Sequence, residues 1–353
     1  MRVAMIPYAV DELDPPLAFV PGWILTLAEK VERLHVVTPA EGVHPSFPSN
    51  VTVYNLQKNQ GASKLKRLAL LYKTLWHILH TEGLDICFIH MHTAMTPICW
   101  PLLQLHNVPI VSWYAHGHVD KTIPLTHRLS ASIVSSCKAA YSYRQDAKVH
   151  YIGQGINETV FRPQDITKDW HILSIGRISP VKGLETLLRA LAELRSRGRD
   201  CSCHLVGNAP AEHAAYLEHL KNLAHELKIT DRVHFLAPVR NSETPAAYNR
   251  AWMHVNCAPS DHSMDKAILE AAFCGTPSLT SADSLRETYG SLSPGLIFAA
   301  NDHVDLANKI ECIPLQGTSG YVELAQKLRS SVQQHSLSAF MGRLIDVLAT
   351  TKH

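Results

Sequence analysis

The sequence has almost no excess of charge of either sign and no long uninterrupted apolar run. Lys and Arg together number 33 and Asp and Glu 31 among 353 residues, so the formal net charge is only +2. A chain this balanced has no general attraction for nucleic acid, so any affinity for anions must come from individual sites. No stretch offers 18 uninterrupted apolar residues, and a membrane-spanning helix is therefore not expected.

The motifs of several catalytic and metal-binding classes are also missing. The eight cysteines include no C-x-x-C pair, the 22 histidines no H-E-x-x-H motif, and no G-x-S-x-G nucleophile elbow occurs. We therefore predict no metal, no cofactor, and reduced thiols rather than disulfides. The N-terminal stretch "MRVAMIPYAVDELDPP" meets acidic residues too soon for a signal peptide, so we expect a cytoplasmic protein.

Strand-like apolar runs alternate with helical periods along almost the whole chain. In the first half they are "RVAMIP", "LHVVTP", "VTVYNL", "DICFIHMH", "PIVSWYAH", "ASIVSS" and "VHYIG", and in the second "WHILSIG", "CHLVG", "RVHFLAP", "MHVNCAPS", "TPSLTS" and "GLIFAA". Such runs are typical of parallel sheets buried on both faces. The predicted fold is α/β, with two doubly wound, Rossmann-like domains facing a central cleft, because one core rarely serves so long a chain.

A polar segment without periodicity, "NETVFRPQDITKDW", lies near the midpoint and is interpreted as the linker. The predicted domains are residues 1–163 and 164–320. Residues 321–353 are predicted to be helices that pack back on the first domain.

One loop combines two cations with a strand end and a helix start. In "SIGRISPVKGLETLLRAL" a buried strand ends at Gly176, Arg177 follows it, and Lys182 precedes leucines at helical spacing. A helix N-terminus attracts anions, and a guanidinium with an ammonium suits a diphosphate. A solvated loop is the alternative.

A carboxylate on a short apolar helix is the second candidate. Glu270 lies in "SDHSMDKAILEAAFCGTPSLTS", between Ala271 and an apolar run. A carboxylate in such surroundings needs a partner, and the hydroxyl pair of a ribose would suit it. The alternative is an ordinary surface glutamate.

These pieces resemble a known family. "GRISPVKGLETLLRAL", "LVGNAP", "RVHFLAPV", "APS…AILEAAFCGTPSL" and "GLIFAANDHVDLANKI" follow the order of the C-terminal domain of family 4 retaining glycosyltransferases, which have the GT-B fold. "IGQGINETVFRP" is similar to their interdomain signature. The resemblance implies an acceptor-binding first domain, a nucleotide-sugar-binding second domain, and transfer without a metal.

The resemblance also assigns roles to residues of the second domain. It implies that Arg177 and Lys182 hold the diphosphate of the donor and stabilise the departing nucleotide. The acidic pair of the family is E-x(7)-E; its second member matches Glu270, implied to bind the ribose. The first member falls on His262, implied to face the donor sugar. Because a neutral imidazole accepts only one hydrogen bond, this departure leaves donor choice open.

A nearby carboxylate could replace the missing glutamate. The family usually has E-G-F-G where this chain has His262, Ser263, Met264 and Asp265, so a glycine of that loop is absent as well. Asp261 or Asp265 could contact the sugar if the loop is shifted in register.

In the first domain the resemblance points to one strand end and one glycine. His116 in "VSWYAHGHVDKT" matches a histidine facing the donor sugar, with His118 as the second choice, and the neighbouring Asp120 and Lys121 are placed toward the acceptor. Gly22 in "PPLAFVPGW" is the available glycine for the family's glycine-rich loop, which is otherwise poorly matched.

The resulting prediction is a retaining hexosyltransferase that uses a UDP- or GDP-sugar and a glycan, lipid-linked or small-molecule acceptor. Two alternatives stay open: a nucleotide-sugar-binding protein with impaired catalysis, favoured by His262, and a GT-B sugar-nucleotide epimerase.

The segment "SKLKRLALLYKTLWHILH" is a basic amphipathic helix, with Leu65, Leu68, Leu71, Leu75 and Leu79 expected on one face. Packing on the sheet explains that face, and peripheral contact with the inner face of a membrane is the alternative.

Overall fold

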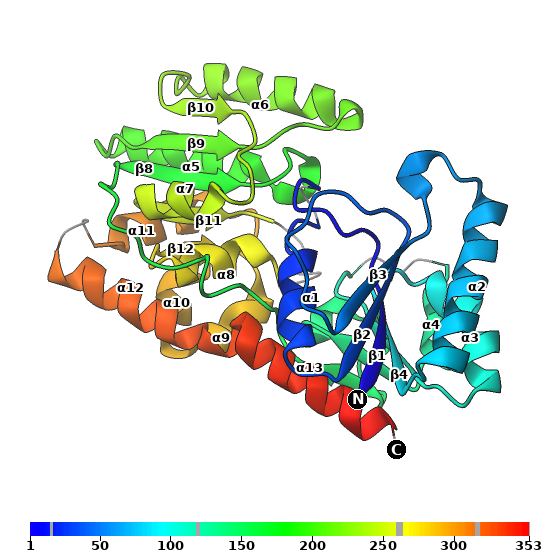
Figure 1. Cartoon of the computed structure of the whole chain (residues 1–353). Helices are drawn as coiled ribbons and strands as arrows, with labels where there is room; N and C mark the ends of the chain where they lie inside the picture. Colours follow the sequence, from blue (N-terminus) through cyan, green and yellow to red (C-terminus); the bar gives the residue numbers. More distant parts are fainter. Residues whose placement is uncertain (15–16, 118–120, 259–263, 315–317, 353) are drawn as a thin grey trace. The chain divides into compact units, whose positions relative to one another are not determined.

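The computed structural model describes residues 1–14, 17–117, 121–258, 264–314 and 318–352. The chain divides into two compact units, Met1–Gly155 with Leu337–His353, and Ile156–Ser336 (Figure 1). The unit boundary at Gly155 precedes the sequence-based boundary at residue 163. The C-terminal helices are shared between the units, because α12 (Ser319–Ser331) belongs to the second and α13 (Leu337–Lys352) to the first.

The first unit contains a seven-stranded sheet in the order β3-β2-β1-β4-β5-β6-β7, and all its neighbouring strands are parallel. Its strands are β1 (Arg2–Ile6), β2 (Arg33–Thr38), β3 (Val51–Asn55), β4 (Ile86–His90), β5 (Ile110–Trp113), β6 (Ser132–Ser135) and β7 (Val149–Tyr151). The winding reverses between β1 and β4, which confirms the doubly wound α/β prediction for this half.

Helices cover both faces of this sheet. They are α1 (Val20–Ala28), α2 (Lys64–Thr81), α3 (Met95–Leu105), α4 (Ile123–Leu129) and α13. Val3 and Met5 of β1 join the core that includes α1 and α13, where the rings of Trp23 and Phe340 lie 4.4 Å apart. The alternate residues Ala4 and Ile6 join a second core with α2 and α3. The period-2 alternation of a strand explains this division.

Helix α2 buries only part of the face that the leucine spacing predicts. Its buried side chains are Leu71, Leu75 and Ile78, whereas Leu65 and Leu68 are exposed. Leu79 is partly buried against the same core, so the predicted face is right for three of its leucines. It fails for Leu65 and Leu68, because they lie on a second apolar stripe that does not pack on the sheet. Ser63 caps the helix, since its hydroxyl accepts a hydrogen bond from the amide of Lys66 at 3.2 Å.

The second unit contains a five-stranded parallel sheet in the order β10-β9-β8-β11-β12. Its strands are β8 (His171–Ile175), β9 (Ser202–Val206), β10 (Val233–Leu236), β11 (Met253–Asn256) and β12 (Ser278–Thr280). Its helices are α5 (Leu184–Ser196), α6 (Ala214–Glu226), α7 (Thr244–Arg250), α8 (Lys266–Phe273), α9 (Arg286–Tyr289), α10 (Ser293–Leu296), α11 (His303–Cys312) and α12.

One predicted strand of this unit does not form. The run "GLIFAA" supplies only a single parallel bridge, between Ile297 and Thr280 of β12. Leu296 ends helix α10, so too few residues remain for a strand, although Leu296, Ile297 and Phe298 are all buried as expected. Within the described residues, no helix has the combination of length and apolar character needed to cross a bilayer.

Candidate functional site

The winding of the second sheet reverses between β8 and β11, and a pocket opens at the carboxyl ends of these strands. Open α/β sheets bind ligands at such reversal points. The pocket is lined by Ser174, Ile175, Gly176, Arg177, Ile178, Lys182, Leu184, Leu205, Val206, Asn256 and Cys257. The loop that the sequence selected as an anion site therefore forms a wall of this pocket.

Two glycines allow the chain to turn sharply at the mouth of the pocket. Gly207 follows β9 with a φ of +157°, and a Cβ on it would lie 1.8 Å from the carbonyl oxygen of Gly176. No side chain fits there without moving the backbone that carries Arg177. The close approach of β8 and β9 thus fixes the direction in which the chain leaves β8.

Arg177 and Lys182 both follow this strand end, but they differ in whether the side chain has a partner. Arg177 is exposed, and its side chain has no hydrogen-bond or ion-pair partner in the described part of the chain. Lys182 closes the short 3-10 turn η3 (Pro180–Lys182), and Gly183, with a φ of +56°, leads into α5. The leucines at helical spacing hold α5 on the sheet, because Leu184, Leu187, Leu188, Leu191 and Leu194 are all buried.

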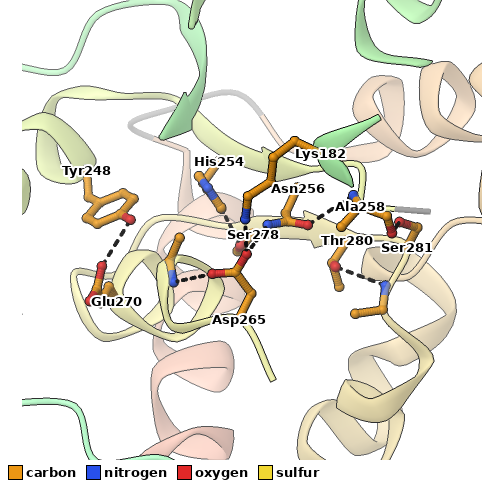
Figure 2. A network of polar contacts seen from close by, with 12 residues as sticks. Lys182, Tyr248, His254, Asn256, Ala258, Asp265, Glu270, Ser278, Thr280 and Ser281 are labelled. Carbon is orange, nitrogen blue, oxygen red and sulfur yellow. Dashed lines mark hydrogen bonds and ion pairs between the residues drawn. The ribbon is translucent and has the colours of Figure 1, made fainter. Parts of the chain in front are cut away.

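Lys182 forms an ion pair with Asp265, which also caps helix α8 (Figure 2). The Oδ1 atom of Asp265 accepts a hydrogen bond from the amide of Ala267 at 3.1 Å, and Oδ2 accepts one from Asn256 Nδ2 at 2.9 Å. Burial alone would raise the pKa of Asp265, but Lys182 and these donors outweigh it and hold the pKa at about 2. The aspartate is therefore ionised at neutral pH.

Glu270 lies one turn further along α8. Its Oε2 accepts a hydrogen bond from the hydroxyl of the fully buried Tyr248 at 3.2 Å (Figure 2). Burial raises the pKa of Glu270, and Lys266, four residues earlier on the same helix, opposes the rise. The sequence predicted that this carboxylate needs a partner. In the structure Tyr248 donates a hydrogen bond to it, and the charge of Lys266 lies close to it.

The predicted residues of the first unit lie at separate places within it. His116 is exposed in the loop after β5, and Lys121 is exposed beyond it. Gly22 lies in the first turn of α1, where its carbonyl oxygen accepts a hydrogen bond from the hydroxyl of Thr26 at 3.0 Å. The glycine is thus part of a helix and not of a loop, because Val20 already begins the helix.

Five residues named from the sequence fall outside the described residues: His118, Asp120, Asp261, His262 and Ser263. Among the described residues, no group of three or more His, Cys, Asp or Glu side chains is arranged to hold a metal ion.

Two features of the site were not predicted from the sequence: the pairing of Lys182 with Asp265, and the hydrogen bond that Asn256 donates to this aspartate. A signal for the cap was present, since Asp265 directly precedes the apolar helix "KAILEAAF", as N-cap residues do. The ion pair joins residues 83 positions apart, and only the pairing of β8 with β11 brings them together.

Solved structures with the same fold define the class. The chain resembles HepE of Anabaena, solved in complex with UDP, with a TM-score of 0.76 and 16% identity over 99% of this chain and 100% of that chain. Sucrose-phosphate synthase of Thermosynechococcus elongatus gives a TM-score of 0.76 with 19% identity over 99% of each chain. The protein therefore has the α/β GT-B fold of glycosyltransferases.

Sequence comparison assigns the family. Residues 156–334 match the family described as "Glycosyl transferases group 1". D-inositol 3-phosphate glycosyltransferase of Corynebacterium jeikeium is 33% identical over 88% of this chain and 87% of its own length. The chain belongs to the group 1 glycosyltransferases.

Other relatives match over a smaller part of the chain. D-inositol 3-phosphate glycosyltransferase of Salinispora tropica is 37% identical, but the match spans 31% of this chain and 23% of that protein. A GDP-mannose-dependent alpha-(1-6)-phosphatidylinositol monomannoside mannosyltransferase of Mycobacterium tuberculosis is 28% identical over 39% of each.

Proposed function

We propose that this glycosyltransferase moves a hexose from a nucleoside-diphosphate sugar to a hydroxyl acceptor and retains the anomeric configuration. One observation carries the proposal: Arg177, which has no partner among the described residues, and the nearby Lys182 line a pocket at the winding reversal of the second sheet. A diphosphate there would receive a guanidinium, an ammonium and the N-terminal end of α5.

The proposed step needs no nucleophile from the protein. The bond between the anomeric carbon and the phosphate oxygen breaks, and the acceptor oxygen forms a bond to the same face of that carbon. The proton of the acceptor hydroxyl passes to the departing phosphate oxygen. Arg177 and Lys182 stabilise the negative charge that develops on this phosphate, so we expect transfer without a metal ion or other cofactor.

The remaining roles follow the family resemblance. Glu270 would accept hydrogen bonds from the ribose hydroxyls, and His116 would face the donor sugar. Gly22, at the start of α1, would lie near the phosphates, and His262 would contact the sugar where the family has glutamate.

The relatives narrow the substrates that we propose. One relative is named for D-inositol 3-phosphate. Another is named for GDP-mannose and a phosphatidylinositol monomannoside. HepE was solved with UDP and with UDP-glucose. We therefore propose a GDP- or UDP-hexose as donor and a polyol or glycolipid hydroxyl as acceptor.

A panel of UDP-, GDP- and ADP-hexoses tests the proposal. We expect transfer or slow hydrolysis of one donor, an unchanged rate after treatment with a chelator, and an α-product from an α-donor in proton NMR. The matched variants are Arg177→Ala, which removes an exposed cation from the pocket, and Arg189→Ala, which removes an exposed cation from α5. Donor binding without turnover would instead favour a nucleotide-sugar-binding protein, the alternative that the replacement of glutamate by His262 suggests.

We also propose that α2 lies against an anionic membrane. Leu65 and Trp76 are 79% and 53% exposed, and Leu68 and Tyr72 lie between them on the same stripe. Lys66 borders this stripe, and α2 contains no acidic residue. Apolar and aromatic side chains bordered by cations fit an interface with anionic lipid.

Co-sedimentation with vesicles tests the membrane contact. We expect binding to phosphatidylglycerol vesicles, weaker binding to phosphatidylcholine, and loss of binding in the double variant Leu65→Glu, Trp76→Glu. Val43→Glu is the control, because Val43 is an exposed apolar residue of the same unit outside α2. Equal binding of the double variant and the control would refute the contact, and dimerisation abolished by the double variant would assign the stripe to a second copy.

A further inference from the structure

The first sheet has its own winding reversal, between β1 and β4, and a cluster of cationic and aromatic side chains lies there. Tyr8 follows β1, and His92 follows β4. Their rings lie 4.9 Å apart. Lys58, in the 3-10 turn η1 (Lys58–Gln60) after β3, donates a hydrogen bond from Nζ to the Tyr8 hydroxyl at 3.4 Å and lies 4.6 Å from the centre of its ring.

No described carboxylate neutralises the positive charge of this cluster. Neither Lys58 nor Arg67, in the first turns of α2, forms an ion pair with a described residue, and two buried nitrogens, Arg67 Nε and His92 Nδ1, have no hydrogen-bond partner there. Burial, together with the smaller effects of the nearby charges of Lys58 and Arg67, lowers the pKa of His92 to about 4. The nearby carboxylate of Glu41 is directed to His44, at 3.1 Å.

The backbone before His92 is held in an unusual conformation. Met91 has a φ of +55°, a region that non-glycine residues seldom adopt. Its amide donates a hydrogen bond to the carbonyl oxygen of Trp113 at 2.9 Å, and its Sδ accepts one from the amide of Ala115 at 3.4 Å. The neighbouring strand end therefore fixes the turn that places His92 at the edge of the sheet.

We infer that Lys58, Arg67 and His92 bind a phosphate group of the acceptor at the carboxyl edge of the first sheet. Unpaired cations and a buried ring nitrogen at a winding reversal are the groups that a tetrahedral oxyanion requires. The inference rests on the proposed transferase function, since it assigns the acceptor of that reaction. It makes the acceptor a phosphate ester, either soluble or in a lipid headgroup.

The ring of His92 reports directly on this site. In NMR spectra of histidine-labelled protein, with the His92 signal assigned through His92→Gln, titration with inorganic phosphate should shift that signal and raise the pKa of His92 above about 4. The double variant Lys58→Ala, Arg67→Ala should bind phosphate about 10- to 100-fold more weakly, the usual range for loss of charge-assisted hydrogen bonds. Lys64→Ala is the control, because Lys64 is exposed on the same helix, and we expect no change.

Three further measurements separate the outcomes. Glycerol 3-phosphate and vesicles containing phosphatidic acid are compared, so that a response of His92 to only one of them assigns a soluble or a lipid phosphate. UDP and GDP binding, which involves Arg177, is measured on the same samples. Nucleotide binding with a silent His92, or a double variant that responds like the wild-type protein, would overturn this inference alone. A phosphate response without nucleotide binding would instead reject the proposed transferase.

Discussion

Replacing Asp265 by asparagine would remove one negative charge from the proposed diphosphate site and leave most contacts in place. Asparagine is as good an N-cap as aspartate, so helix α8 should keep its first hydrogen bond, now made at 3.1 Å to the amide of Ala267. The change acts mainly on Lys182, which would lose its ion-pair partner. An incoming diphosphate would then no longer compete with a carboxylate for this ammonium.

The size of the effect follows from the charges. A carboxylate about 6 Å from a phosphate repels it by about 3 kcal/mol at an effective dielectric constant near 20. Salt at physiological strength reduces this to about 1–2 kcal/mol. We therefore expect Asp265→Asn to bind UDP or GDP about 5- to 30-fold more tightly than the wild-type protein, since each 1.4 kcal/mol is a factor of ten.

Calorimetry with UDP and GDP at low and high salt measures this change. The gain in affinity should shrink as the salt concentration rises, because the repulsion is screened. Asp265→Ala is the comparison variant: it should show the same gain but also lose the cap, so that its free energy of unfolding is about 1 kcal/mol below that of Asp265→Asn. Weaker nucleotide binding by a folded Asp265→Asn protein would refute the reasoning and show that the carboxylate positions Lys182 for the ligand.

Three other changes test separate parts of the site. Because the folded pKa of Asp265 is about 2 against an ordinary value of 3.8, its contribution of about 2 kcal/mol should be present above pH 4 and lost as the pH falls from about 4 to about 2; acid unfolding of Asp265→Asn should lack this component. Gly207→Ala should lower the free energy of unfolding by about 3 kcal/mol in urea titrations, since the new Cβ would lie 1.8 Å from the carbonyl oxygen of Gly176; an unchanged value would mean that the strand ends separate freely. Glu270→Gln should weaken binding of UDP or GDP but not of inorganic pyrophosphate, and an equal loss for both would place Glu270 away from the ribose.

The strands were predictable because each is a short apolar run, and most of them, such as β1, β4 and β11, are buried on both faces, although β3 and β10 at the sheet edges are partly open to solvent. The same reasoning failed where an apolar run serves a helix and a bridge at once, as at Leu296 and Ile297. It was only partly right on α2, because Leu65 and Leu71 belong to two different apolar stripes and hydrophobic spacing does not tell which stripe meets the sheet. Tertiary packing decides between such faces, and a local pattern does not contain that information.

The candidate site shows the same limit. Arg177 and Lys182 could be found from the sequence, since strand, glycine, cation and helix follow one another within a few residues. Asp265 was considered for the donor sugar, and nothing local indicated that it pairs with Lys182. That pair depends on the parallel pairing of β8 with β11, which also brings Asn256 to the carboxylate.

Strand order explains where the unpaired cations of both units lie. In each sheet the chain begins near the middle, winds to one edge, and then returns to start the other half beside its first strand. At that reversal the two connecting loops leave in opposite directions, so no crossover helix covers the strand ends between them. Arg177 follows the first strand of the second sheet, and Tyr8 with His92 follows the corresponding pair in the first. Among the described residues, Arg177, Lys58 and Arg67 have no carboxylate partner, whereas Lys182 is paired with Asp265. If both sites bind phosphate, removing the single charge of Asp265 should therefore raise the affinity for phosphate at Lys182. No equivalent substitution is available at Lys58 or Arg67, because neither is paired with a described carboxylate.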